Sequence, residues 1–146
     1  MEKRKDHAIT VLLFVLYLSA MLLLLFHREP RDGHPYNMTP FYTIRTCWDL
    51  LFRSDPVALA HKHYALVNLL GNVAVFIPLG LFLPLLFQRE RGFFQFLITT
   101  TLVICLIELV QLLTRRGALD IDDLLLNVPG ACLGWLVWRI WNRKKE

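Results

Sequence analysis

Four long apolar runs constrain this chain more than any other feature of its sequence. They cover residues 8–26, 65–87, 93–113 and 121–141. A helix of about 20 residues crosses a hydrocarbon core about 30 Å thick. Of the 146 residues, 55% are hydrophobic and 19% are charged, which is more apolar surface than a small soluble core can hide. The sequence therefore predicts an all-α fold, an integral membrane bundle of four transmembrane helices that forms a single domain over residues 1–146.

The segment between the first two runs predicts a short helix outside the membrane. Turn-forming residues extend to Pro40, so a helix must begin after it. From there Phe41, Ile44 and Trp48 recur at helical spacing, with polar residues around the rest of the wheel. This pattern is typical of an interfacial helix, here over about residues 41–52. We expect it to cap the bundle; a gate for substrate access is the alternative.

Basic residues beside the first and last runs predict the orientation. An even number of crossings places both termini on one side, and these flanking residues are Lys3, Arg4, Lys5, Arg139, Arg143, Lys144 and Lys145. The positive-inside rule then places both termini in the cytoplasm. The same residues account for the net charge of +4, which suits anionic lipid head groups. No basic helix with interleaved aromatic residues is present, so we expect no nucleic-acid partner.

The third run carries a polar stripe towards its end. Glu108, Gln111 and Arg115 are three and four residues apart, so the sequence predicts that they share one helical face. A carboxylate inside an apolar run costs a few kcal/mol on insertion scales, and it persists mainly where it faces a partner, a cavity or a ligand. This stripe therefore predicts a polar site.

A second stripe begins the fourth run. Asp120, Asp123 and Asn127 share a face, Asp120 can cap the helix, and Asp122 lies near the positive end of its dipole. We expect the two stripes to face each other across their short turn, with two asparagines of the second run as a further wall. The candidate ligand-binding residues are Asn68, Asn72, Glu108, Gln111, Arg115, Asp120, Asp123 and Asn127.

Structural explanations of the same residues remain open. A carboxylate could simply neutralise Arg115, Asp120 could only start a helix, and the asparagines could be hydrogen-bonding glue between helices. Small residues predict close helix packing at Gly71, Gly80, Gly130 and Gly134. We expect no cofactor and no metal site, although Asp120, Asp122 and Asp123 are oxygen ligands of the kind that suits Mg²⁺. Three widely spaced cysteines indicate no disulfide framework.

An ordered set of motifs resembles the VanZ-like family of small bacterial membrane proteins. The motifs are Asn37-x-x-Pro40-Phe41, residues 68–80 (NLLGNVAVFIPLG), Glu108-x-x-Gln111, Arg115, Asp120-Ile121-Asp122-Asp123 and Asn127-x-x-Gly130-x-x-x-Gly134. The resemblance covers residues 37–134. It implies a multi-pass protein of the bacterial plasma membrane and cell envelope, in a family whose founding member is associated with antibiotic resistance towards teicoplanin. It does not imply a molecular activity.

Three functions are consistent with these residues. The leading hypothesis is binding of an anionic lipid or a lipid-linked envelope intermediate, with Arg115 on a phosphate and Glu108 orienting the arginine. The second is a metal-dependent enzyme acting on an envelope lipid phosphoester, and the third is a small lipid transporter or scramblase in which Glu108 changes protonation. We expect binding rather than catalysis. A homo-oligomer is compatible with the glycine pairs.

Overall fold

Four long helices dominate the computed structural model, which describes residues 2–27, 36–52, 58–116 and 119–143. They are α1 (Glu2–Phe26), α3 (Ala58–Leu86), α4 (Phe93–Leu113) and α5 (Ile121–Arg143). Each contains a segment long and apolar enough to cross a membrane. The predicted all-α bundle of four membrane helices is confirmed. α1 begins at Glu2 and α3 at Ala58, before the apolar runs that begin at residues 8 and 65. Both helices therefore extend beyond their hydrophobic segments.

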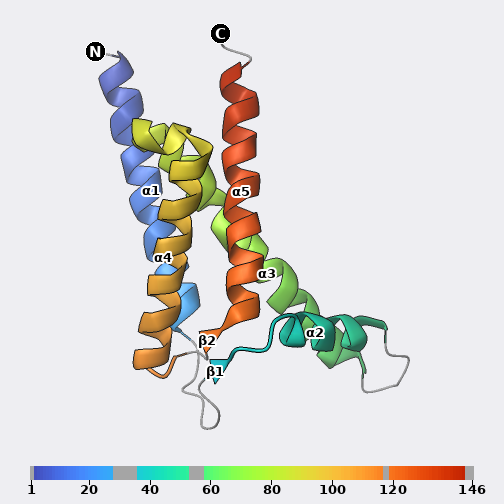
Figure 1. Ribbon diagram of the computed structural model, residues 1–146. Coiled ribbons are helices and arrows are strands. Elements are labelled where there is room, and N and C mark those ends of the chain that lie inside the picture. The colour runs from blue at the N-terminus through green and yellow to red at the C-terminus, as the bar shows by residue number, and fades with distance from the viewer. Residues whose placement is uncertain (1, 28–35, 53–57, 117–118, 144–146) are drawn as a thin grey trace.

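Short elements connect these helices at the two ends of the bundle. A 3-10 turn, η1 (Gln88–Arg91), joins α3 to α4, and α2 (Tyr42–Phe52) precedes α3. Two strands of two residues each, β1 (Tyr36–Asn37) and β2 (Leu119–Asp120), pair in parallel. Figure 1 shows both termini and η1 at one end, which we call the proximal end, and α2 with the strand pair at the other, the distal end. The strand pair was not expected from the sequence.

The closest helix contact joins α3 to α5 through glycines. A methyl group added at Gly80 would collide with the backbone of Ala131, and one at Gly134 would collide with the backbone of Ile77. Gly130 lies equally close to the backbone of Val73. Because no side chain separates the helices at these points, their backbones are in direct contact, as in small-residue packing of membrane helices.

Gly71 does not take part in this packing. A methyl group added there would meet no atom within 4 Å. The prediction that Gly71 packs against a neighbouring helix is therefore wrong for the described part of this chain. Nine residues, or about half a turn beyond two full turns, separate Gly71 from Gly80, so the two glycines lie on opposite faces of α3.

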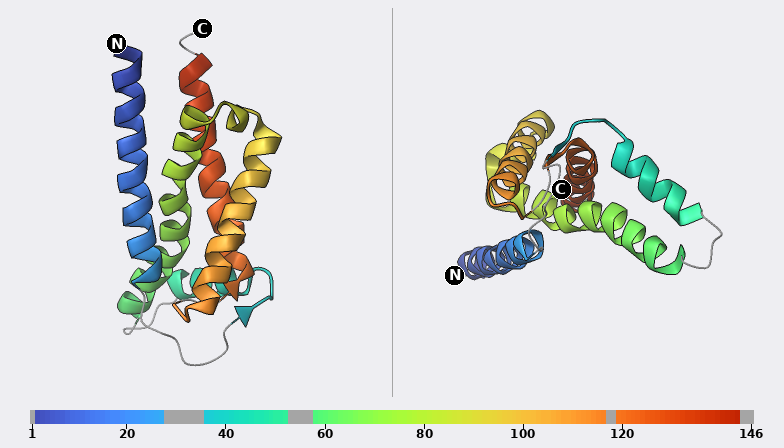
Figure 2. Two further views of the ribbon diagram at one scale, coloured as in Figure 1. Left: turned by 90° about the vertical axis from the view of Figure 1, so that its left-hand side faces the viewer. Right: turned by 90° about the horizontal axis from the view of Figure 1, so that it is seen from below.

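α1 lies at the edge of the bundle, as the view along the helices shows (Figure 2). The Tyr17 hydroxyl donates to the carbonyl of Val75 at 2.7 Å, and its ring stacks on Phe82 with centroids 5.9 Å apart. Only 11% of the apolar window of α1 is buried, compared with 33% in α3 and α5. Most of the α1 surface is therefore left for lipid.

Candidate functional site

Asp122 joins the start of α5 to the start of α2. Its side chain is fully buried; Oδ1 accepts from the backbone N–H of Phe41 at 2.5 Å and Oδ2 from that of Ile44 at 3.0 Å. The first N–H groups of a helix have no partner within the helix. Asp122 therefore caps α2 from about 80 residues away. Phe41 has φ 64°, a left-handed conformation that is unfavourable for an aromatic residue and is held here by this contact.

Asp120 contributes to the same junction from β2. Oδ2 accepts from the Thr43 hydroxyl at 2.6 Å and Oδ1 from the Asn37 side-chain amide at 3.3 Å. Oδ1 also accepts from the backbone N–H of Asp122 at 2.9 Å, which is the N-cap bond of α5. Asp120 thus starts α5 and also anchors the loop before α2. It precedes α5, so it does not share a helical stripe with Asp123 and Asn127 as the spacing predicts.

Asp123 connects α5 to α3. Its Oδ1 accepts a short hydrogen bond from the side-chain amide of Asn72, which is buried. We call Asp120, Asp122 and Asp123 the aspartate clasp, because together they hold β1, α2 and α3 at the distal end. From the sequence, Asp122 is expected only to interact with the dipole of the last helix or to be a metal ligand. Its burial and its hydrogen bonds to α2 depend on a contact between segments that are far apart in the chain.

Asn68 and Cys47 form a neighbouring polar pair between α3 and α2. The asparagine amide donates to the thiol at 3.6 Å, and Cys47 is 2% exposed. Burial raises the pKa of the Cys47 thiol; the hydrogen bond from Asn68 lowers it, and the charges of the aspartate clasp raise it further. Asn68 therefore faces α2 rather than the centre of the bundle.

The α4 stripe is buried but does not act as one group. Glu108 is 4% exposed and Gln111 is 3% exposed. The Gln111 amide donates to the carbonyl of Leu25 at 2.9 Å, so it joins α4 to the last turn of α1, whose final carbonyls lack helical partners. Asn127 on α5 is 2% exposed, and its Oδ1 has no hydrogen-bond partner in the described part of the chain.

Arg115 lies beyond the end of α4, on an exposed turn. Its φ is 57°, its N–H donates to the Leu112 carbonyl at 3.1 Å, and the Arg116 N–H donates to the Gln111 carbonyl at 3.0 Å. These bonds form a Schellman motif with Arg115 at the left-handed position that glycine usually occupies. The prediction that Arg115 continues the helical stripe of Glu108 and Gln111 is wrong, because α4 ends at Leu113.

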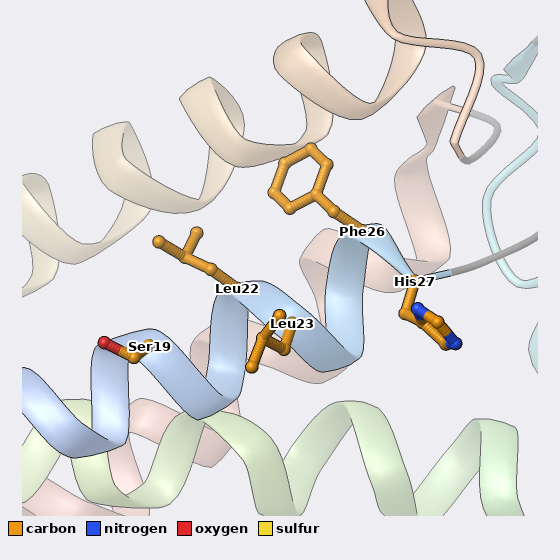
Figure 3. Close-up of a pocket in the computed structure, with 5 residues that line it drawn as sticks. All are labelled: Ser19, Leu22, Leu23, Phe26 and His27. Atoms are coloured by element: carbon orange, nitrogen blue, oxygen red, sulfur yellow. The ribbon is translucent and has the colours of Figure 1, made fainter.

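An apolar groove of about 660 Å³ runs along the distal half of α1. Its lining residues are Ser19, Leu22, Leu23, Phe26 and His27. Figure 3 shows Leu22 and Phe26 pointing towards α4. Gln111, in the last turn of α4, contacts Leu25 in the same part of α1.

The oxygens of the aspartate clasp serve as hydrogen-bond acceptors within the protein. Both oxygens of Asp120 and of Asp122 accept hydrogen bonds from protein groups. Within the described ranges, no group of three or more His, Cys, Asp or Glu side chains could hold a metal ion.

Sequence reasoning missed the partners of the clasp on the first loop. Asn37, Thr43 and the backbone N–H of Phe41 all donate to it. One signal was available: Asn37-x-x-Pro40-Phe41 and Asp120-Ile121-Asp122-Asp123 were both among the motifs of the resemblance. Nothing in their spacing indicated that the two motifs are in contact.

Comparisons with known proteins agree with this architecture. No solved structure matches the chain. Protein VanZ of Enterococcus faecium is 35% identical, over 70% of this chain and 71% of that protein. The family model VanZ/LLP1 matches residues 11–142, which include α3, α4, the aspartate clasp and most of α1 and α5. The chain therefore belongs to the VanZ/LLP1 family.

Proposed function

We propose that the protein binds the anionic head group of a membrane lipid, or of a lipid-linked envelope intermediate, at the distal end of the bundle. Arg115 is the residue that meets the phosphate, and the α1 groove takes an acyl chain. With both termini in the cytoplasm, this site faces the outer leaflet of a bacterial plasma membrane. Its occupancy alters susceptibility to glycopeptides such as teicoplanin, which would connect the site to the resistance associated with the founding member of the family.

The conformation of Arg115 is the observation that carries this proposal. A residue other than glycine in the left-handed region costs about 1–2 kcal/mol, and the Schellman motif around Arg115 would form more readily with glycine. An unfavourable residue at such a position favours a role for its side chain. The guanidinium is exposed at the level where a lipid head group lies, and it matches phosphate oxygens with two parallel hydrogen bonds.

The α1 groove supports a lipid rather than a soluble anion. Apart from Ser19 and His27, its lining side chains are hydrocarbon, and it opens on the least buried helix. An acyl chain placed there would gain van der Waals contacts with the apolar side chains of α1, whereas a soluble anion would gain none. His27 at the end of the groove and Arg115 on the adjoining turn supply polar groups for the head group.

Arg115→Gly separates binding from folding. Glycine suits a φ of 57°, so this variant should not be destabilised. Its free energy of unfolding should equal that of the parent protein or exceed it by up to about 1 kcal/mol. Loss of a charge-assisted arginine–phosphate contact should weaken lipid binding roughly tenfold or more. The measurement is native mass spectrometry of the detergent-solubilised protein with added phosphatidylglycerol, alongside thermal unfolding.

The control is Arg45→Gln, which removes one exposed charge from α2 at the same end of the bundle. Equal lipid binding by Arg115→Gly and by Arg45→Gln would refute the proposed site. In a teicoplanin-susceptible bacterium, expression of the parent protein should raise the inhibitory concentration and expression of Arg115→Gly should not. An equal rise with the parent protein and with Arg115→Gly would show that resistance does not depend on this site.

A further inference from the structure

A basic pocket of about 300 Å³ lies at the proximal end, remote from the site proposed above. Its lining residues are Arg91, Trp138, Arg139, Asn142 and Arg143. They come from η1 and from the last turns of α5. Three arginines and one asparagine thus line a single hollow, and their side chains carry hydrogen-bond donors of the kind that suits an anion.

Packing holds two of the three arginines in place. Arg91 Nε donates to the carbonyl of Pro84 at 3.4 Å, and the Arg139 guanidinium lies 5.1 Å from the centre of the Trp135 ring. Trp138 is 6% exposed and forms the aromatic wall. Because these contacts restrict the guanidinium groups before any ligand arrives, less conformational entropy is lost on binding.

The neighbouring carboxylate does not neutralise this pocket. Glu90 is 6% exposed; its Oε1 accepts from the Thr99 hydroxyl at 3.2 Å, and its backbone carbonyl accepts from Trp135 Nε1 at 3.1 Å. Glu90 is therefore held inside the bundle by α4 and α5, while Arg91 beside it in the sequence is exposed. Among the described residues, the side chain of Glu90 is therefore held away from the arginines of the pocket by Thr99.

We propose that this pocket binds the phosphate of an anionic phospholipid in the leaflet that faces the termini. The pocket lies where α3 and α5 end and α4 begins, which is head-group depth for a four-span bundle. Apolar side chains on the first turn of α4 and the last turns of α5 are exposed, with Phe94 78% and Ile140 51% exposed. A lipid places its phosphate among the arginines and its acyl chains against this apolar surface, whereas a soluble anion would use only the arginines.

The experiment measures retention of phosphatidylglycerol by native mass spectrometry, with phosphatidylcholine as the zwitterionic comparison. The variant is Arg139→Gln/Arg143→Gln, and its charge-matched control is Arg89→Gln/Arg45→Gln, two exposed arginines that do not line the pocket. Both are also prepared with Arg115→Gly, so that lipid bound at the distal site does not contribute. Circular dichroism and thermal unfolding check that each variant folds.

Loss of two basic groups near a membrane surface corresponds to roughly 30-fold weaker binding. We expect that loss for phosphatidylglycerol in the pocket variant, little change in the control, and weak retention of phosphatidylcholine throughout. Equal losses in both folded variants, or no loss in either, would overturn the proposal. Displacement of the lipid by millimolar inorganic phosphate would overturn it too, because the ligand would then be a soluble anion.

Discussion

Replacement of Asp122 by alanine should release α2 from the bundle while the four membrane helices stay folded. The buried carboxylate accepts two backbone N–H groups, from Phe41 and Ile44. A hydrogen bond to a charged group contributes about 1.5–3 kcal/mol. The two bonds therefore total about 3–6 kcal/mol, and their loss also leaves the left-handed conformation of Phe41 unsupported.

The effect should be local because the clasp and the bundle core use different contacts. α3 and α5 pack through Gly80, Gly130 and Gly134, and none of these contacts involves Asp122. Hydrogen exchange by mass spectrometry on protein in lipid nanodiscs measures the opening of residues 37–52 separately from that of the membrane helices. A loss of 3 kcal/mol corresponds to roughly 100-fold faster exchange in that segment.

Asp49→Ala is the matched control, since Asp49 is an exposed aspartate on α2 itself. It should leave the exchange of residues 37–52 within about twofold of the parent protein, because surface substitutions change stability by about 0.5 kcal/mol or less. Similar exchange in the two variants would refute the role of Asp122 as a cap for α2. Equally fast exchange in the cores of α3 and α5 would refute the separation between the clasp and the bundle.

Two further predictions follow from packing and burial. Gly134→Ala should destabilise the protein by about 1–3 kcal/mol or more in SDS-induced unfolding, because its methyl group meets the backbone of Ile77. Gly71→Ala should leave the stability unchanged or raise it by up to about 1 kcal/mol. Equal stabilities of the Gly134→Ala and Gly71→Ala variants would contradict this account. In a Cys105→Ser/Cys132→Ser protein, Cys47 should react slowly with maleimide at pH 7 and faster as the pH rises past the usual thiol range, because the raised pKa lowers its thiolate fraction. Rapid labelling at pH 7 would contradict this, and Asp122→Ala should accelerate the labelling by exposing the thiol.

The polar residues show how far spacing can be trusted. Spacings of three and four residues correctly indicated that polar side chains within α4 would be turned away from lipid, since Glu108 and Gln111 are both buried. Spacing could not indicate which helix each polar side chain contacts. Gln111 contacts α1 rather than the acidic segment, and Asn68 contacts α2. Arg115 and Asp120 leave their stripes because α4 ends at Leu113, before Arg115, and α5 begins at Ile121, after Asp120.

The hydrophobicity of the sequence predicts the four membrane helices, because the transfer of each apolar run into lipid depends on its own residues. The helical spacing of apolar residues likewise predicts the short helix α2. The role of the aspartate clasp is visible only in the packed structure. Asp122 meets Phe41 across 81 residues, and α5 packs on the face of α3 that carries Gly80, opposite to the face that carries Gly71. Such contacts depend on which faces two elements turn towards each other, and that choice is a property of the packed helices rather than of either segment alone.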